Sequence, residues 1–294
     1  MLEALTLREG YFGDPAAFQA LADLLQDIFG IDISHQMKLG GPDPTSMPFG
    51  YFDPSGRCVA NFSAFSMPLV VNGRVVRAAG YQSGAVRPDY RGQGLYRTLM
   101  KRAFDWAERG GFEAGILLTD KPGLYEPYGF RTIPQFKFYG AVPQADLLVP
   151  RARDLDLKQT ADLHMVQMAL DTRQPVSETF SVVRQKEMFL LNAHFDPDIR
   201  LSLLAEDDAV IAWKPQGQTS LQILDVAARN VPPLGHIVAS LGPNFQNAEV
   251  FFPPDRLDWK GAARPHQGDC VLMVRGLEPA SLTQPFMLSP LADF

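Results

Sequence analysis

A glycine-containing turn at residues 91–96 constrains the fold of this chain more than any other short segment. The turn reads Arg-Gly-Gln-Gly-Leu-Tyr, follows an extended apolar segment that Pro88 ends, and opens a helical pattern that runs to Arg109. The first turn of a helix carries unpaired N–H groups and a partial positive charge, and glycine lets an anion approach the backbone. The sequence therefore predicts a site for a phosphorylated cofactor where a strand turns into a helix.

Strand and helix patterns on both sides of this turn predict a mixed α/β fold. In the first half we expect a helix from Asp14-Pro15 to Gly30, a loop with or without a short helix at 31–48, strands at 57–66 and 114–119, and a strand pair at 131–143. Asn72-Gly73 predicts a tight hairpin whose return strand continues to residue 86. In the second half we expect helices at 157–171, 179–193 and 234–241, and strands at 199–204, 210–213, 221–227, 250–252 and 270–274.

The length of 294 residues predicts two domains, with a charged, proline-punctuated junction at 149–156. The net charge of −6 disfavours a nucleic-acid partner. Neither a signal peptide nor an apolar run of about 20 residues is apparent, so we expect no membrane association and a cytoplasmic location. The sequence is compatible with a homo-oligomer and does not determine the oligomeric state.

The two cysteines, Cys58 and Cys270, lie in apolar runs and have neither a metal-ligand spacing nor a disulfide pattern. We therefore interpret both as core residues in a reducing compartment. The five histidines are scattered, and none has a ligand neighbour at zinc-site spacing, so no metal is expected.

A second motif follows the glycine turn by about thirty residues. After the strand end Val86-Arg87-Pro88 and the run Arg91-x-x-Gly94, the chain reads Leu124-Tyr125-Glu126-x-x-Gly129-Phe130. Over residues 50–140 this order of motifs resembles the GNAT superfamily of acetyl-CoA-dependent N-acyltransferases. The family signature is Arg/Gln-x-x-Gly-x-Gly/Ala, so Arg91 and Gly94 match it and Tyr96 departs from it.

A bulky residue at position 96, within a Gly-Leu-x-x-x-Leu-Met run, is similar to the enhanced-intracellular-survival (Eis) type branch of aminoglycoside and lysine acetyltransferases. That branch has a second, degenerate GNAT-like domain, which residues 146–294 would form beside a catalytic GNAT domain at 1–145. Its C-terminal sterol-carrier-like domain has no room here. The chain is thus either a shortened relative or a bacterial two-domain GNAT protein of another kind.

The resemblance implies a site for acetyl-CoA. Backbone N–H groups of residues 92–96 would hold the pyrophosphate, the strand end at residues 85–86 would pair with the pantetheine, and the acceptor amine would enter between the strands at Val86 and Leu117-Leu118. Arg87 and Arg91 either contact phosphate or lie on ordinary surface. The cofactor-binding residues that we predict on this basis are Ala85, Val86, Arg87, Arg91, Gly92, Gln93, Gly94, Leu95 and Tyr96.

Tyr125 matches the family tyrosine that lies beside the thioester sulfur, and a phenol can give a proton to the departing thiolate. The alternative is a tyrosine that packs the end of a short helix. For the general base the sequence leaves Glu126, Asp120 and a water relay open. The terminal carboxylate at Phe294 is also a candidate, because the Eis branch uses its C-terminal carboxylate.

The expected function is transfer of an acetyl group from acetyl-CoA to a primary amine of a small molecule or peptide, by direct attack. Two alternatives remain: a non-catalytic acyl-CoA sensor of the same fold, and a phosphate-binding protein of unrelated fold. An acidic acceptor pocket would favour polyamines or aminoglycosides, but the sequence does not identify the residues that line it.

Overall fold

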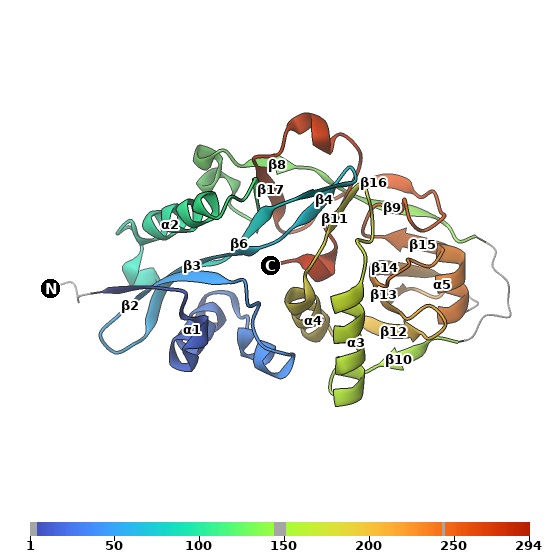
Figure 1. Cartoon of the computed structure of the whole chain (residues 1–294), viewed down its shortest axis with the longest axis horizontal. Helices are drawn as coiled ribbons and strands as arrows, with labels where there is room; N and C mark the ends of the chain where they lie inside the picture. Colours follow the sequence, from blue (N-terminus) through green and yellow to red (C-terminus); the bar gives the residue numbers. More distant parts are fainter. Residues whose placement is uncertain (1–4, 144–150, 243–244) are drawn as a thin grey trace.

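The structure is a computed structural model that describes residues 5–143, 151–242 and 245–294 of the chain (Figure 1). It confirms the expected mixed α/β fold, with two seven-stranded sheets and a three-stranded sheet in the described residues. No helix in these ranges is both long enough and apolar enough to cross a membrane. Short 3₁₀ helices connect the larger elements: η1 (Tyr11–Gly13), η2 (Ile33–Lys38), η3 (Pro88–Tyr90), η4 (Pro122–Leu124), η5 (Glu126–Tyr128), η6 (Pro279–Leu282) and η7 (Pro290–Ala292).

The first large sheet carries the glycine turn and has two helices on opposite faces. Its order is β1 (Thr6–Glu9), β2 (Met47–Phe52), β3 (Cys58–Ser66), β6 (Ala78–Val86), β7 (Ala114–Thr119), β17 (Val271–Arg275) and β8 (Arg131–Ile133). Only β6 and β7 pair in parallel among these neighbours. Helix α1 (Pro15–Phe29) lies on one face and α2 (Leu95–Arg109) on the other (Figure 1).

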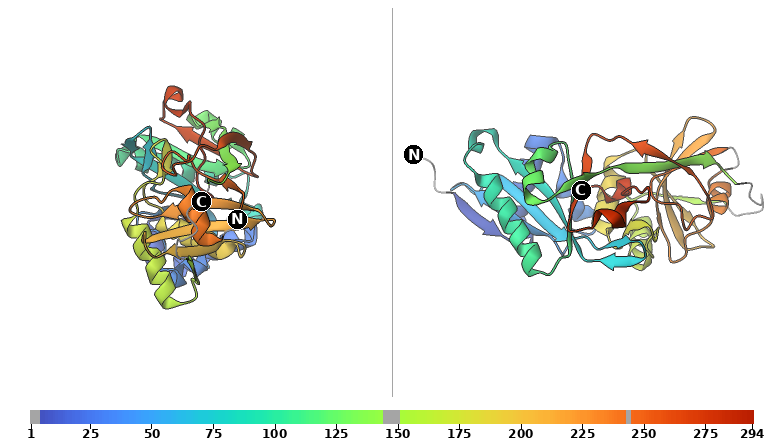
Figure 2. Two further views of the ribbon diagram at one scale, coloured as in Figure 1. Left: turned by 90° about the vertical axis from the view of Figure 1, so that its right-hand side faces the viewer. Right: turned by 90° about the horizontal axis from the view of Figure 1, so that it is seen from above.

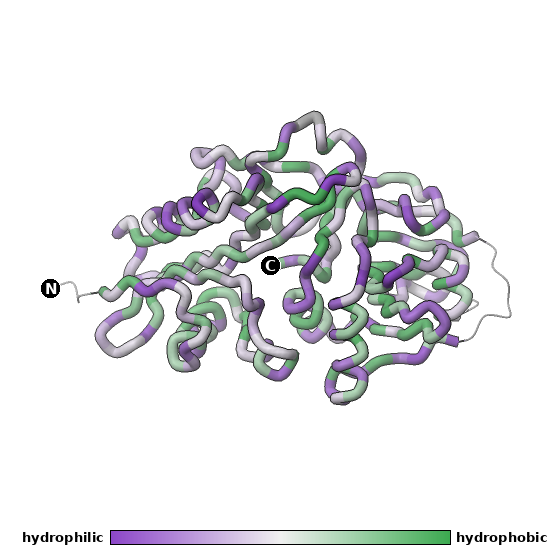
Figure 3. The backbone as a smooth tube through the Cα atoms, in the orientation of Figure 1, coloured by the Kyte–Doolittle hydropathy of each residue, from purple (hydrophilic) through white to green (hydrophobic). Residues whose placement is uncertain are grey.

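Both helices form where the sequence predicts them. Asp14 caps α1 by accepting hydrogen bonds from the N–H groups of Ala16 and Ala17, and Gly30 ends the helix in a left-handed conformation with φ 74°. Helix α2 is amphipathic, with apolar residues from Leu99 to Ala107 on its buried face, and Figure 3 shows hydrophilic and hydrophobic segments alternating along it. Each helix therefore buries one face against the sheet.

The second large sheet also has helices on both of its faces. Its order is β10 (Arg153–Leu155), β12 (Arg200–Leu204), β13 (Ala209–Gln216), β14 (Ser220–Ala227), β15 (Asn247–Val250), β9 (Gln135–Ala141) and β16 (Ala262–His266). Helix α5 (Leu234–Leu241) packs on one face. Helices α3 (Thr160–Thr172) and α4 (Lys186–Phe195) pack on the other, where one hydrophobic cluster also includes α1 of the first half.

Two strands cross between the halves of the chain. The predicted strand pair at 131–143 is split, because β8 joins the first sheet whereas β9 pairs with β15 and β16 of the second. In return β17 lies between β7 and β8 of the first sheet. Figure 2 shows from above how the β8–β9 segment runs from one sheet to the other. The division into 1–145 and 146–294 therefore stays a prediction, and the sheets do not follow it strictly.

The predicted hairpin forms a bridge between the halves. Its strands β4 (Leu69–Val71) and β5 (Arg74–Val76) flank Asn72 and Gly73, which both have positive φ as the turn requires. Strand β4 also pairs with β11 (Phe180–Val182) in the small sheet. Two expectations were wrong here: β5 ends at Val76 instead of continuing in one sheet to residue 86, and residues 180–182 are a strand, so that α4 begins only at Lys186. The strand at 180–182 pairs with β4, which lies over 100 residues away in the chain, and local sequence patterns do not report such a distant partner.

Candidate functional site

The candidate site is built around an opening between β6 and β7. These two strands pair only where Ala78–Gly80 of β6 meets Ala114–Ile116 of β7. Beyond Gly80 the strands diverge, since β7 continues alongside β17 while β6 stays paired with β3 on its other edge. The second half of β6 therefore offers unpaired backbone groups toward the opening, as an extended ligand with amide groups would require.

A β-bulge shapes this half of β6. The pairing register with β3 shifts between Asn61 and Ser63, and Ser83 has a positive φ of 58°. The buried amide of Asn61 donates to the Ser83 carbonyl at 2.8 Å, while its own carbonyl oxygen accepts from the Tyr11 hydroxyl at 2.5 Å. A buried hydrogen-bond network thus holds the strand in the conformation that opens it away from β7.

The glycine turn lies directly after β6 and opens α2. Gly92 and Gly94 have φ of 78° and 77°, a conformation that favours glycine. Gly94 is the N-cap of α2, and it has no side chain to accept from the first N–H groups of the helix. These groups are therefore available to an anion. Nε of Arg91 donates to the Val86 carbonyl at 3.1 Å, so Arg91 stays next to the end of β6.

The tyrosines of the two sequence motifs meet at the opening. The hydroxyl oxygens of Tyr96 and Tyr125 are 2.6 Å apart. Gly84 makes this possible, because a Cβ atom at that position would lie 2.2 Å from the Tyr96 hydroxyl oxygen. Tyr125 is buried against Phe62 and Phe130. Position 96, where Tyr departs from the Gly/Ala signature, therefore contributes a hydroxyl directly to Tyr125.

Burial controls the protonation of this pair. Desolvation raises the pKa of Tyr125, the hydrogen bond from Tyr96 opposes that rise, and the charge of Asp120 adds to it. Burial, together with the neighbouring Tyr125, raises the pKa of Tyr96 well above its ordinary value. Both phenols are therefore protonated at neutral pH, and a phenolate formed at Tyr125 would accept a hydrogen bond from Tyr96.

A cavity of about 770 Å³ occupies the opening and reaches both faces of the sheet. On the α2 face it is lined by Phe62, Tyr81, Tyr96 and Tyr125, and on the other face by residues of α1 and α4 such as Leu25 and Leu191. Of the residues predicted from sequence, those that line it are Ala85, Val86, Arg91, Tyr96, Leu118, Asp120, Tyr125 and Phe294. Two motifs and two residues predicted as base candidates, Asp120 and Phe294, thus come together in one space.

Other predicted residues lie elsewhere. Arg87 is 4% exposed, and its guanidinium pairs with Asp27 of α1 at 2.6 Å and donates to the Cys58 carbonyl at 2.9 Å. It therefore connects β6 to α1. Gly92, Gln93, Gly94 and Leu95 form the turn before the cavity, where only their backbone is relevant to an anion. Glu126 is exposed at the start of η5 and is not part of the cavity lining.

The cavity also contains residues that sequence reasoning missed. Cys270 was expected in the core but is exposed and lines the cavity, because it precedes β17 instead of lying within it; only Cys58 is buried. Asp293 lines the cavity too, held there by Asn192 of α4, which donates to the Asp293 carbonyl at 2.7 Å. Figure 1 shows the C-terminal segment between the first sheet and α4. The signal for this placement was the family resemblance, which made the terminal carboxylate at Phe294 a candidate base.

Burial and nearby carboxylates act on the pKa values of two groups in the cavity. Desolvation raises the pKa of Asp293 above its ordinary value. Desolvation and then the charges of Asp293 and Asp120 raise the pKa of Cys270. The site thus combines negative charge with protonated phenols. In the described ranges, no three His, Cys, Asp or Glu side chains group together as a metal site would need.

A family model matches the part of the chain that carries both sequence motifs. Residues 16–133 match the family model described as an acetyltransferase (GNAT) domain. This span covers the glycine turn and the Tyr125 motif. No curated protein matches the chain in sequence.

Solved structures of similar fold cover almost the whole chain. A probable N-acyltransferase of unknown function from Enterococcus faecalis is 14% identical with a TM-score of 0.59, covering 92% of this chain and 72% of that one. Eis1 from Mycobacterium abscessus is 15% identical with a TM-score of 0.58 and coverages of 92% and 73%. A GCN5-related N-acetyltransferase from Kribbella flavida is 17% identical with a TM-score of 0.54 and coverages of 92% and 72%. At these identities the likeness shows the fold.

Proposed function

We propose that this chain, which contains a GNAT acetyltransferase domain over residues 16–133, transfers the acetyl group of acetyl-CoA to a primary amine. The observation that carries the proposal is the convergence of Tyr125, the free edge of β6 and the start of α2 on one cavity. A cofactor that binds along the edge and the turn would present its thioester beside a buried phenol.

The donor would bind through the backbone. The pyrophosphate fits the uncapped N–H groups at the start of α2, with Arg91 as the neighbouring cation. The pantetheine amides would pair with the free edge of β6 at Ala85 and Val86. Arg87 is left out of this assignment, because Asp27 and the Cys58 carbonyl already hold its guanidinium.

The reaction would proceed by direct attack. The amine nitrogen forms a bond with the thioester carbonyl carbon, and the carbon–sulfur bond breaks to leave the thiolate of coenzyme A. Tyr125 gives its phenolic proton to that sulfur. The Tyr96 hydroxyl, 2.6 Å away, donates to the Tyr125 oxygen as negative charge develops on it. The cavity continues past the tyrosines, which leaves space for an acceptor and favours catalysis over a sensor.

The amine enters as an ammonium ion and must lose one proton to a base before attack. The second proton leaves the nitrogen as the amide forms, and it restores the proton that Tyr125 gave to the sulfur. Asp120 and Asp293 both line the cavity and attract the cation. We assign the base to Asp293. Desolvation raises the pKa of its carboxylate toward neutral pH, and a general base works best when its pKa lies near the operating pH. Both residues are exposed, but the Asp120 carboxylate lies 3.4 Å from the Lys121 ammonium, so Asp120 is the weaker candidate. On this assignment residues 146–294 would supply the catalytic carboxylate and α4 to the acceptor side, so this domain would take part in catalysis.

The test is release of coenzyme A thiol from acetyl-CoA with a panel of primary amines. Tyr125→Phe should lower kcat by about 10²-fold, the lower end for a general acid, with an unchanged Kd for acetyl-CoA. Tyr128→Phe is the matched control in the same motif. Asp293→Asn should lower kcat/KM at neutral pH, with the loss shrinking at high pH where the amine is already deprotonated. Acetyl-CoA binding without turnover on any amine would indicate the sensor instead.

A further inference from the structure

We propose that the acceptor carries its amine on an apolar alkyl or aryl body, which binds along a hydrophobic wall of the cavity on the α1 and α4 side. The wall consists of Ile28 and Phe29 from the end of α1, Ile31 just after that helix, and Met188, Leu191 and Phe195 from α4. This inference rests on the proposed function, and it names the class of substrate which that function would take.

Three large apolar residues of the wall are exposed to solvent. Phe29 is 51% exposed, Ile31 44% and Phe195 40%, although all three line a cavity that leads to Tyr125. Hydrophobic side chains gathered at a concave site are typical of ligand pockets, since a bound apolar group removes them from water. The exposure therefore marks the wall as a surface that a substrate covers.

The cavity also carries acidic side chains. Among the described side chains that line it, the acids are Asp120, which directly follows β7, and Asp293, whose carbonyl accepts from Asn192 of α4. Asp120 lies on the segment that leads from β7 to Tyr125. An ammonium group would be drawn toward the thioester, with the rest of the molecule on the wall. A polycation would instead bring several charges against apolar side chains, which is costly.

The wall lies on the face of the sheet opposite the start of α2, which assigns it to the acceptor and not to the donor. The start of α2, where the pyrophosphate would bind, lies on one face, and the wall lies on the opposite face with α1. The divergence of β6 and β7 connects the two faces beside Tyr125 and Gly84. An acetyl group reaches only into this opening, so the wall beyond it faces the molecule that enters from the other side.

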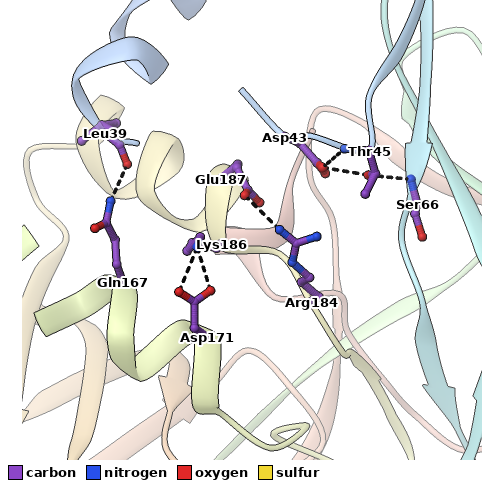
Figure 4. A network of polar contacts seen from close by, with 9 residues as sticks. All are labelled: Leu39, Asp43, Thr45, Ser66, Gln167, Asp171, Arg184, Lys186 and Glu187. Carbon is purple, nitrogen blue, oxygen red and sulfur yellow. Dashed lines mark hydrogen bonds and ion pairs between the residues drawn. The ribbon is translucent and has the colours of Figure 1, made fainter. Parts of the chain in front are cut away.

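The segments that carry the wall are held in place by contacts of α3 with the loop after α1 and with α4 (Figure 4). Gln167 of α3 donates to the Leu39 carbonyl of the loop after α1 at 2.9 Å. Lys186, at the start of α4, binds both carboxylate oxygens of Asp171 at 2.7 and 2.9 Å. The segments that carry the wall are therefore fixed before any ligand binds, which favours one shape of substrate over another.

The experiment compares n-alkylamines from propylamine to octylamine, used below their micelle-forming concentrations, with phenethylamine, spermidine and kanamycin as acceptors. We expect kcat/KM to rise roughly fourfold per added methylene, which corresponds to about 0.8 kcal/mol, and to be lowest for the two polycations. Ile31→Ser and Phe29→Ser should flatten this rise. Met37→Ser is the matched control, because Met37 is 63% exposed nearby on η2 and lies outside the cavity lining.

A rate independent of alkyl length, or a preference for spermidine or kanamycin, would overturn the inference. A dependence on acyl length between acetyl-CoA and octanoyl-CoA, with no dependence on amine length, would assign the wall to the donor. Calorimetric binding of octylamine and propylamine to the coenzyme A complex separates the two proposals. If octylamine binds more tightly than propylamine, if Ile31→Ser removes the difference, and if neither amine is acetylated, the result would support the wall and contradict the proposed function. Equal binding of the two amines would contradict the wall.

Discussion

Tyr96→Phe isolates one hydroxyl at the centre of the site. The ring that packs against Phe62 remains, and only the hydroxyl 2.6 Å from Tyr125 is lost. A hydrogen bond to a group that becomes charged contributes about 1.5–3 kcal/mol. At 1.36 kcal/mol per factor of ten, full charge on Tyr125 in the transition state corresponds to a loss of about 10- to 150-fold in kcat. Partial proton transfer would place the loss near the lower figure.

The assay is single-turnover acetyl transfer with saturating amine, which reports chemistry without product release. The Kd for acetyl-CoA should stay unchanged, because the backbone of the turn is intact. Gly84→Ala offers a second route to the same defect, since its Cβ would lie 2.2 Å from the Tyr96 oxygen and displace the hydroxyl without removing it. Tyr128→Phe controls for the loss of a phenol from the same loop.

A single-turnover rate in Tyr96→Phe within about threefold of the original protein would refute this role, because less than about 0.7 kcal/mol would then depend on the hydroxyl. An equal loss in Tyr128→Phe would also refute it, because the effect would then belong to the loop. The free energy of unfolding, measured in urea for each variant, shows whether a lowered rate reflects an altered fold.

Two further predictions concern the framework around the site. Asp225→Asn should lower the free energy of unfolding in urea by about 3–5 kcal/mol, because Arg173, with only 5% of its side chain exposed, loses its partner at 3.3 Å. The double variant Arg173→Met/Asp225→Leu should recover most of that loss, and a change below about 1 kcal/mol in Asp225→Asn would contradict the reasoning. In the folded protein iodoacetamide should modify Cys270 and spare Cys58, since burial raises the pKa of the Cys58 thiol to about 12. Asp120→Asn should speed the modification of Cys270 at a given pH, because removing a negative charge lowers the pKa of that thiol; mass spectrometry after timed alkylation would show an unchanged rate if the charge has no effect.

Local patterns predicted most elements and failed where pairing is distant. The cap at Asp14, the glycine stop at Gly30 and the Asn72-Gly73 turn act within a few residues, so the sequence reports them directly. The segment at 180–182 was predicted as helix, yet it is a strand because it pairs with β4 across more than 100 residues of chain. The strands at 131–133 and 135–141 were found, but their assignment to different sheets depends on partners elsewhere in the chain.

The sequence by itself determined the donor half of the proposed site. The turn at 91–96 is short and continuous, and its affinity for an anion depends on local backbone geometry, so residue order suffices to predict it. The proposed role of Tyr125 follows from the resemblance of its motif to that of the GNAT superfamily. Only the tertiary structure decided the acceptor half. Tyr96 reaches Tyr125 because Gly84 leaves room, while Asp293, Cys270 and the wall on α4 join the cavity because β17 and the C-terminal segment return to the first sheet. The physical reason is that hydrophobic burial, which brings these segments together, depends on surface shared between distant parts of the chain.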